Sequence, residues 1–286
     1  MKNALRILAS YLTLTRYRQT IWQRWYRPFD DNPFHINPTQ IPREHYLELA
    51  AEARERTYPK FMAQVERYFG CLPEKEFIDD LALSTQVVIK KSKLLYVHGY
   101  LLYAALHHYV AAHPDATSIT ILETGTARGF SALCMAKALQ DAQRHGKIIT
   151  IDILPVEKPI YWNCIHDAEG QQTRLQLLEP WQDLVEKYII FLRGYTDIVL
   201  RQLGLTRIHA AFLDSGHNYE TLKSELDFTA QHQQKGDVII CDDYTPDQFP
   251  GVVKAIDEFL ARGCYEGQLF MSEEGRGYMY CCRTET

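Results

Sequence analysis

The clearest pattern in the second half of the chain is a series of short apolar runs, each of a length that suits a buried strand. Five of these runs are predicted as strands: residues 119–123, 147–152, 188–193, 209–214 and 237–241. Helical spacing of apolar residues follows the first run over 131–139, the third after Thr196 and the fifth over 250–259. Because strands that alternate with helices form parallel sheets, this order predicts an α/β fold with helices on both faces.

The first half of the chain carries helical patterns instead. Prolines between residues 28 and 42 predict an irregular connector, and residues 44–68 are predicted as one helix. A shorter helix is expected within residues 73–91. A strongly apolar helix is expected over residues 92–113, where Pro114 ends it. This half therefore supplies a helical extension ahead of the first strand.

Composition and charge narrow the class of protein. The chain has 286 residues and a net charge of −5, which argues against a general nucleic-acid binder. Its seven cysteines show no C-x-x-C spacing, and an odd number without a framework suits a reducing compartment, so we expect a cytoplasmic protein. No apolar stretch approaches the roughly 20 residues that a membrane-spanning helix needs.

The first 29 residues hold six Lys or Arg and no acid, mixed with aromatic residues. Leucines at helical spacing, Leu5, Leu8 and Leu12, predict a helix there. A basic and aromatic helix can lie on an anionic membrane surface, so peripheral membrane contact is one hypothesis. The alternative is a helix that packs on its own domain or on another subunit of a homo-oligomer.

The first predicted strand ends in an acidic residue and a glycine turn. Glu123 is followed by Gly125 and Gly129, in the spacing acid-x-G-x-x-x-G. This is neither the G-x-G-x-x-G fingerprint of a dinucleotide site nor a phosphate loop with G-K-[ST]. Since a carboxylate repels a pyrophosphate and attracts an amine, the turn favours a cationic ligand without phosphate. The alternative is an ordinary strand-to-helix turn of another α/β protein.

This turn resembles motif I of the class I S-adenosylmethionine-dependent methyltransferases, whose cofactor carries an ammonium and a sulfonium. The resemblance covers about residues 92–286 and implies a Rossmann-like, seven-stranded, mostly parallel sheet, with residues 1–91 as the extension. It also implies an acid after the second strand that accepts hydrogen bonds from the cofactor ribose. The implied cofactor-binding residues are Glu123, Gly125, Thr126, Gly129, Asp152, Gly194 and Thr196.

Two further features of the chain lie close to this cofactor site by the same resemblance. Lys93, His98 and Gly99 are candidates for its methionine end by position, although His98 could equally be a hydrogen-bonded structural histidine. Residues 153–187 are longer than a connection requires and are treated as an insertion that could form a lid or substrate wall. Its aromatic residues could stack on a substrate or hold the insertion together.

Three acids follow the fourth and fifth predicted strands. Asp214 ends the fourth strand, His217 lies three residues later, and Asp242 and Asp243 follow the fifth. If these strands are neighbours in a parallel sheet, the carboxylates meet at its carboxyl edge and repel one another unless something neutralises them. Oxygen ligands suit Mg²⁺, so we predict a metal site at Asp214, Asp242 and Asp243. The alternative is that the acids cap turns and bind only water or backbone amides.

The same residues resemble the metal-dependent O-methyltransferases of the catechol and macrocin types. There, D-x-x-[KH] after strand four and D-[ND] after strand five are metal and base positions. The resemblance thus places Asp214, Asp242 and Asp243 on the metal and His217 on the base. The sequence departs from the catechol type in two places, since that type has asparagine at the position of Asp243 and lysine at that of His217. The alternative for His217 is a residue that caps the next helix.

Together these features predict an O-methyltransferase that uses S-adenosylmethionine. It would methylate a hydroxyl of a small molecule or sugar with assistance from Mg²⁺. One alternative is a metal-independent methyltransferase of the same fold. Another is a catalytically silent Rossmann-like protein that binds partners or membrane through residues 1–29. The sequence contains no pattern that specifies the methyl acceptor or the oligomeric state.

Overall fold

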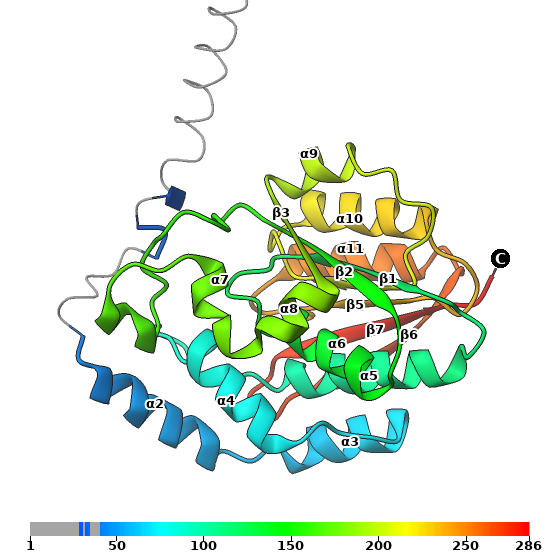
Figure 1. Ribbon diagram of the computed structural model, residues 1–286. Coiled ribbons are helices and arrows are strands. Elements are labelled where there is room, and N and C mark those ends of the chain that lie inside the picture. The colour runs from blue at the N-terminus through cyan, green and yellow to red at the C-terminus, as the bar shows by residue number, and fades with distance from the viewer. Residues whose placement is uncertain (1–28, 31, 35–40, 286) are drawn as a thin grey trace, which may run out of the picture.

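A seven-stranded sheet forms the centre of the computed structural model, which describes residues 29–30, 32–34 and 41–285 (Figure 1). The strand order across the sheet is β3-β2-β1-β4-β5-β7-β6. The strands are β1 Ile119–Thr124, β2 Gly146–Asp152, β3 Ile189–Arg193, β4 Ala210–Leu213, β5 Val238–Cys241, β6 Tyr265–Met271 and β7 Gly277–Arg283. The predicted Rossmann-like α/β fold and its five parallel strands are confirmed.

Strands β1 to β5 pair in parallel, whereas β7 runs antiparallel to both β5 and β6. The chain order reverses between β1 and β4, which lie side by side at the centre of the sheet. In folds of this kind, ligands bind beyond the carboxyl ends of the strands at the point of reversal. Since β4 also pairs with β5, the loops that follow these three strands share one edge.

Helices cover both faces of the sheet, as Figure 1 shows. Helices α2 to α6 and α8 lie on one face, and α9, α10 and α11 lie on the other. The helices are α2 Arg43–Glu55, α3 Pro59–Phe69, α4 Lys75–Thr85, α5 His98–Ala112, α6 Phe130–Asp141, α7 Arg174–Leu177, α8 Gln182–Tyr188, α9 Thr196–Leu200, α10 Tyr219–Gln231 and α11 Pro250–Leu260.

Side chains that alternate along the strands fill two separate cores. Ile121 of β1 packs with the helices of the first face, while its neighbour Leu122 packs with α10 and α11. This alternation follows from the two-residue period of a strand. Both cores are apolar, which explains why the strands read as nearly continuous hydrophobic runs.

Two helix predictions in the first half of the chain are wrong in their bounds. Residues 44–68 form two helices, because Pro59 begins α3 and lacks the N–H that a continued helix would need. The apolar helix expected over residues 92–113 begins only at His98. Ahead of it the backbone is irregular, and the carbonyl of Leu94 accepts a hydrogen bond from Arg56 at 3.1 Å.

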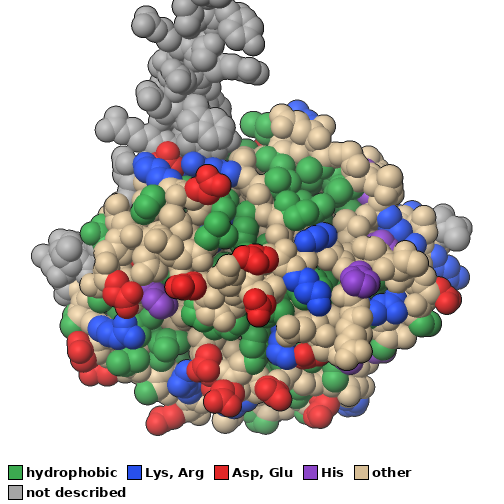
Figure 2. Space-filling model, viewed as in Figure 1, with side chains coloured by type: hydrophobic (Ala, Val, Ile, Leu, Met, Phe, Trp, Pro, Cys, Tyr) green, Lys and Arg blue, Asp and Glu red, His purple; other side chains and the backbone are tan. Residues whose placement is uncertain are grey.

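The surface and the first residues leave the sequence-based predictions on charge and membrane contact unchanged. Figure 2 shows acidic side chains spread over the lower, helical half of this face. Among the described residues, no helix is long and apolar enough to cross a membrane. The predicted basic helix at the start of the chain, with its hypothesis of membrane contact, lies outside the described residues.

Gly125 connects the turn after β1 to the loop after β4. Its φ is +90°, in the left-handed region that favours glycine, and a Cβ at this position would lie 1.9 Å from the carbonyl oxygen of Asp214. The backbone of the glycine turn therefore lies directly against the backbone that carries the first acid. No residue other than glycine allows this approach without displacing one of the two loops.

We predict that Gly125→Ala destabilises the protein by about 3 kcal/mol, the sum of a left-handed alanine and a backbone clash. Gly70 is a matched control, because its φ is +82° and nothing lies within 4 Å of the position of its Cβ. Gly70→Ala should cost only about 1 kcal/mol. Denaturant unfolding of both variants measures the difference, and equal losses would contradict a close contact at Gly125.

Candidate active site

The loops at the carboxyl edge of the sheet enclose a first cavity of about 300 Å³. Four of the seven predicted cofactor-binding residues line it, namely Gly125, Asp152, Gly194 and Thr196. They come from the ends of β1, β2 and β3, so strand order brings together residues that are about 70 positions apart along the chain. The cavity is also lined by Phe29, Ile151, Ile153, Tyr195, Asp197, Ser215, Gly216 and Thr221.

Asp152 is held in a fixed orientation at this cavity. One carboxylate oxygen accepts a hydrogen bond from the backbone N–H of Ala127 at 2.6 Å, and the other accepts from Leu154 N–H at 2.6 Å. Ala127 has a φ of 45°, so this bond fixes an uncommon conformation in the glycine turn. A carboxylate oriented in this way can accept further hydrogen bonds from hydroxyl groups such as those of a ribose.

Glu123 lies beneath the turn, and its side chain is not among the residues that line the cavity. It is fully buried and accepts hydrogen bonds from the hydroxyls of Ser131 and Thr150. Burial raises its pKa to about 7. The geometry therefore gives Glu123 a supporting position, where it joins β1, β2 and the start of α6, rather than the direct contact with a cofactor amine that the sequence predicted.

Two more predicted cofactor residues also lie outside the lining of the cavity. Thr126 is buried, and its hydroxyl pairs with that of Thr150. Gly129 caps α6 with a φ of +93° and faces Leu178, whose methyl carbon would lie 2.9 Å from a Cβ at Gly129. These residues shape the turn and leave its exposed side to Gly125.

Phe29 is a cavity residue that sequence reasoning missed. It lines the first cavity although it precedes β1 by about 90 residues. The next residue, Asp30, forms ion pairs with Arg193 at the end of β3 and, at 3.8 Å, with Lys158. The sequence signal was only the general abundance of aromatic residues in this segment, which gave no reason to place one of them beside Asp152.

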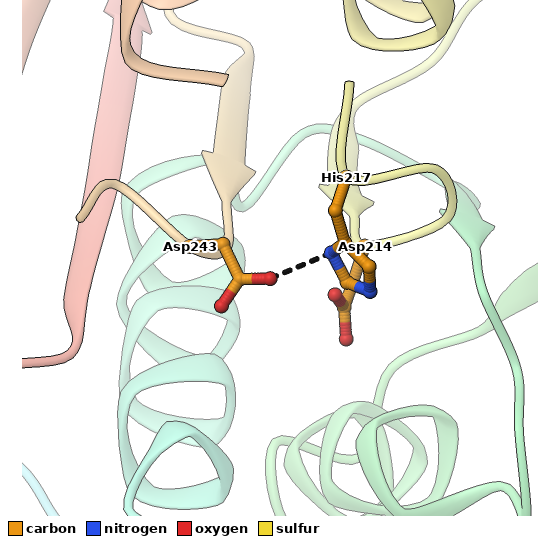
Figure 3. A group of neighbouring side chains, drawn as sticks. All are labelled: Asp214, His217 and Asp243. Carbon is orange, nitrogen blue, oxygen red and sulfur yellow. Dashed lines mark ion pairs between the residues drawn. The ribbon is translucent and has the colours of Figure 1, made fainter. Parts of the chain in front are cut away.

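A second cavity, of about 420 Å³, lies beside the acids at the ends of β4 and β5. Figure 3 shows Asp214 and His217 on the loop after β4, facing Asp243 after β5. The Nδ1 atom of His217 lies 2.6 Å from a carboxylate oxygen of Asp243. One potential ligand atom from each of the three residues lies within 4.8 Å of the others. The predicted convergence of Asp214 and Asp243 is thus observed, with His217 as the third member.

Asp242 is not part of this group of three donors. Its expected role as a third metal ligand does not fit the geometry. Both of its carboxylate oxygens accept hydrogen bonds from Arg276, with Nε at 2.8 Å from Oδ1. The same guanidinium lies 3.2 Å from Asp243. Arg276 precedes β7, and no pattern in the sequence pointed to it. It supplies the neutralising charge that three neighbouring carboxylates require.

The charges of this cluster shift the pKa values of its members in different directions. Burial, reinforced by the charge of Asp242, raises the pKa of Asp214 well above its ordinary value. Burial also acts to raise the pKa of Asp242, but the guanidinium of Arg276 holds it below its ordinary value. The hydrogen bond to Asp243 raises the pKa of His217. Of Asp214 and Asp242, it is therefore Asp242 that is held as an anion.

The three donors, two carboxylates and one imidazole, fit a divalent cation. They suit Mg²⁺ less well than a set of oxygen ligands alone would. Asp214 and Asp243 offer carboxylate oxygens and His217 offers an imidazole nitrogen. Carboxylates suit Mg²⁺ and Mn²⁺, while imidazole is a ligand that Mg²⁺ seldom takes and that later transition metals prefer. A cation here would favour the ionised form of Asp214, against the burial that raises its pKa.

The candidates for the methionine end of the cofactor occupy structural positions. Lys93 forms an ion pair with Glu274 at 2.9 Å on the rim of the second cavity. Gly99 lies against α6, where a Cβ would come within 2.6 Å of the ring of Phe130. His98 is buried, and burial lowers its pKa to about 3. Its Nδ1 has no hydrogen-bond partner among the described residues, so the expected hydrogen-bonded histidine is not seen at that atom.

Two side chains of the segment 153–187, Trp162 and His166, make contacts that hold it in place. Trp162 is fully buried, its indole N–H donates to the carbonyl of Gln172 at 2.7 Å, and the guanidinium of Arg174 lies 5.5 Å from its ring. It therefore holds the segment together, one of the two roles expected for these aromatics. His166 lies 3.0 Å from the hydroxyl of Ser84, which joins the segment to α4.

We predict that Arg276→Gln destabilises the protein by about 3–5 kcal/mol, because it leaves the buried carboxylate of Asp242 without its partner. The double variant Arg276→Gln/Asp242→Asn should recover much of that loss. The matched control is Arg262→Gln, which breaks an exposed pair with Asp227 and should cost less than about 1 kcal/mol. Denaturant unfolding provides all three values, and an equal loss for Arg262→Gln would contradict the account.

Comparison with known proteins gives a family match and a shared fold. Residues 122–244 match a family model described as a methyltransferase domain. A comparison with curated proteins found no match. The fold is shared with the O-methyltransferase from Bacillus cereus in complex with S-adenosylhomocysteine (SAH), at 14% identity and a TM-score of 0.53 over 77% of this chain and 97% of that one.

Two further solved structures show the same fold. TomG from Streptomyces achromogenes, an O-methyltransferase in complex with S-adenosylmethionine, has 18% identity and a TM-score of 0.51 over 77% of this chain and 96% of that one. The O-methyltransferase NovP has 18% identity and a TM-score of 0.52 over 73% of this chain and 99% of that one. The comparisons thus identify a methyltransferase domain over residues 122–244, in a chain whose fold is shared with solved O-methyltransferase structures.

Proposed function

We propose that the protein transfers the methyl group of S-adenosylmethionine to a hydroxyl of a small molecule or sugar. The observation that carries the proposal is the loop after β4, which contributes to both cavities. Ser215 and Gly216 line the first cavity, and His217 lines the second. Only a few residues of one loop would then separate a cofactor in the first cavity from an acceptor in the second. Methyl transfer requires such closeness, because the acceptor oxygen attacks the methyl carbon in line.

His217 is the general base of this reaction, oriented by Asp243. Its Nδ1–H donates to the carboxylate at 2.6 Å, which leaves Nε2 as the acceptor of a proton. Nε2 takes the proton of the acceptor hydroxyl while the oxygen attacks the methyl carbon. The carbon–sulfur bond breaks, its electron pair stays on sulfur, and SAH is formed. Most of the rate enhancement comes from alignment of the two reactants.

The cofactor would lie over Gly125 with its ribose hydroxyls on Asp152, and Gly194 and Thr196 would line its far end. Support comes from the four residues that share the first cavity. Phe29 would cover the cofactor from the side of the N-terminal segment. Glu123, Thr126 and Gly129 would act through the shape of the turn rather than by contact.

A metal-assisted form of the reaction is the second candidate. It is favoured by the three donor atoms of Asp214, His217 and Asp243 that lie within 4.8 Å of one another. A divalent cation held there would lower the pKa of an acceptor hydroxyl. The two candidates differ in one measurable respect, since only the second requires added metal for turnover.

We predict that Asp152→Asn and Phe29→Ala each weaken SAH binding about tenfold, because one removes a charged hydrogen-bond acceptor and the other an apolar wall. Asp183→Asn, on the exposed side of α8, is the control and should bind SAH like the unmodified protein. Isothermal calorimetry measures the three affinities. Unchanged binding in both cavity variants would move the cofactor to another site.

We predict that His217→Ala lowers turnover about 10²- to 10⁴-fold, as expected for loss of a general base, while SAH affinity stays within twofold. His145→Ala, exposed just before β2, is the control. SAH release is measured with catechol and with methyl glucoside as probe acceptors, with EDTA or with added Mg²⁺ or Mn²⁺. Turnover that survives EDTA excludes the second candidate, and full activity of His217→Ala would contradict the base assignment.

A further inference from the structure

An apolar groove of about 310 Å³ lies beside the proposed acceptor cavity and has no role in the reaction as described so far. Its walls come from the end of α2, from α3, from the segment after α3 and from the irregular residues ahead of α5. Most of its lining is aliphatic or aromatic: Ala53, Tyr58, Pro59, Met62, Leu72, Pro73, Leu94, Leu95, Tyr96, Val97 and Tyr100.

Three observations place this groove next to the acceptor cavity. Leu95 lines both of them. Tyr58, which lines the groove, is close enough to Glu274 and Lys93 on the rim of the acceptor cavity for their charges to act on its pKa. The backbone N–H of Lys60 donates to Glu273 at 2.8 Å, which fixes α3 against the same turn. The two spaces therefore adjoin along one wall.

The acceptor cavity has the opposite chemistry on its side of Leu95. Lys90 and Arg276 contribute positive charge to its wall, and Lys93 lies at its rim. Arg276 is paired with Asp242, and Lys93 with Glu274. Lys90 is exposed and forms no ion pair within 4.0 Å with a carboxylate of the described residues, although the charges of Asp242 and Asp243 act on it from farther away. The cavity thus presents an unpaired ammonium within the space that holds His217.

We infer that the methyl acceptor is amphipathic: an anionic group beside its hydroxyl binds Lys90, and an apolar chain or ring system extends past Leu95 into the groove. The inference rests on the proposed function, because it assumes that the acceptor hydroxyl lies at His217. Burial of an apolar chain supplies affinity in proportion to its length, while the ammonium selects for the anion. A polar sugar without an apolar part would leave the groove unused.

The test measures acceptor binding in the presence of saturating SAH, with three probes of graded chemistry. 3-Hydroxydecanoate carries the anion, the hydroxyl and a chain; 3-hydroxybutanoate lacks the chain; 1-decanol lacks the anion. We expect 3-hydroxydecanoate to bind at least tenfold more tightly than either of the other two. Equal affinities of the long and short acids would overturn the inference.

Two pairs of variants assign the effect to the groove and to Lys90. Met62→Trp fills the groove and should remove the advantage of the long acid without changing the affinity of the short one; Leu47→Trp, exposed on α2, is its control. Lys90→Met should weaken both acids at least fivefold and leave 1-decanol unchanged. Its neighbour Lys91, exposed and not part of either lining, is the control as Lys91→Met.

These outcomes are distinguishable from a failure of the proposed function. If SAH does not bind, the methyltransferase site itself is misplaced. If SAH binds and the His217 variant loses turnover, but chain length has no effect on acceptor affinity, only the amphipathic acceptor is overturned. If Met62→Trp does not fold, the comparison of the three probes on the unmodified protein still decides, because it requires no variant.

Discussion

The site depends on one ion pair, between the partly exposed Arg276 and the buried Asp242. Parallel pairing of β4 and β5 brings Asp214, Asp242 and Asp243 to one edge of the sheet, where burial makes their mutual repulsion costly. Arg276 binds Asp242 through two hydrogen bonds and also lies 3.2 Å from Asp243. With that charge compensated, Asp243 is left to orient His217. The acids therefore divide into Asp242, which Arg276 binds through both oxygens, and Asp214 and Asp243, whose carboxylates lie close to His217.

A second constraint joins this cluster to the cofactor side. The carbonyl of Asp214 lies so close to Gly125 that a Cβ would approach it to 1.9 Å. The turn after β1 and the loop after β4 consequently act as one unit, with Asp152 fixing the turn through Ala127. This contact explains how a short loop can serve two cavities. In the proposed reaction, a shift of either loop would change the distance between the sulfonium methyl group and the acceptor oxygen, to which methyl transfer is sensitive.

The sequence predicted the sheet well because buried parallel strands are continuous apolar runs, and it predicted the edge acids because each directly follows such a run. It predicted the direction of side chains less well. Glu123 fits an acidic motif, yet its alternating position on β1 turns it toward Ser131 and Thr150. Arg276 and Phe29 could not be found, because tertiary folding brings them from the turn before β7 and from the N-terminal segment, and no periodicity records such contacts.

The central claim is that Asp242 is structural while Asp214, His217 and Asp243 form the reactive cluster. Anomalous diffraction from crystals grown with Mn²⁺ and SAH tests it most directly, because Mn²⁺ accepts both carboxylate and imidazole ligands. The account predicts that any bound Mn²⁺ lies among those three residues, with both oxygens of Asp242 still on Arg276. A Mn²⁺ peak bonded to Asp242, with Arg276 displaced from it, would contradict the account.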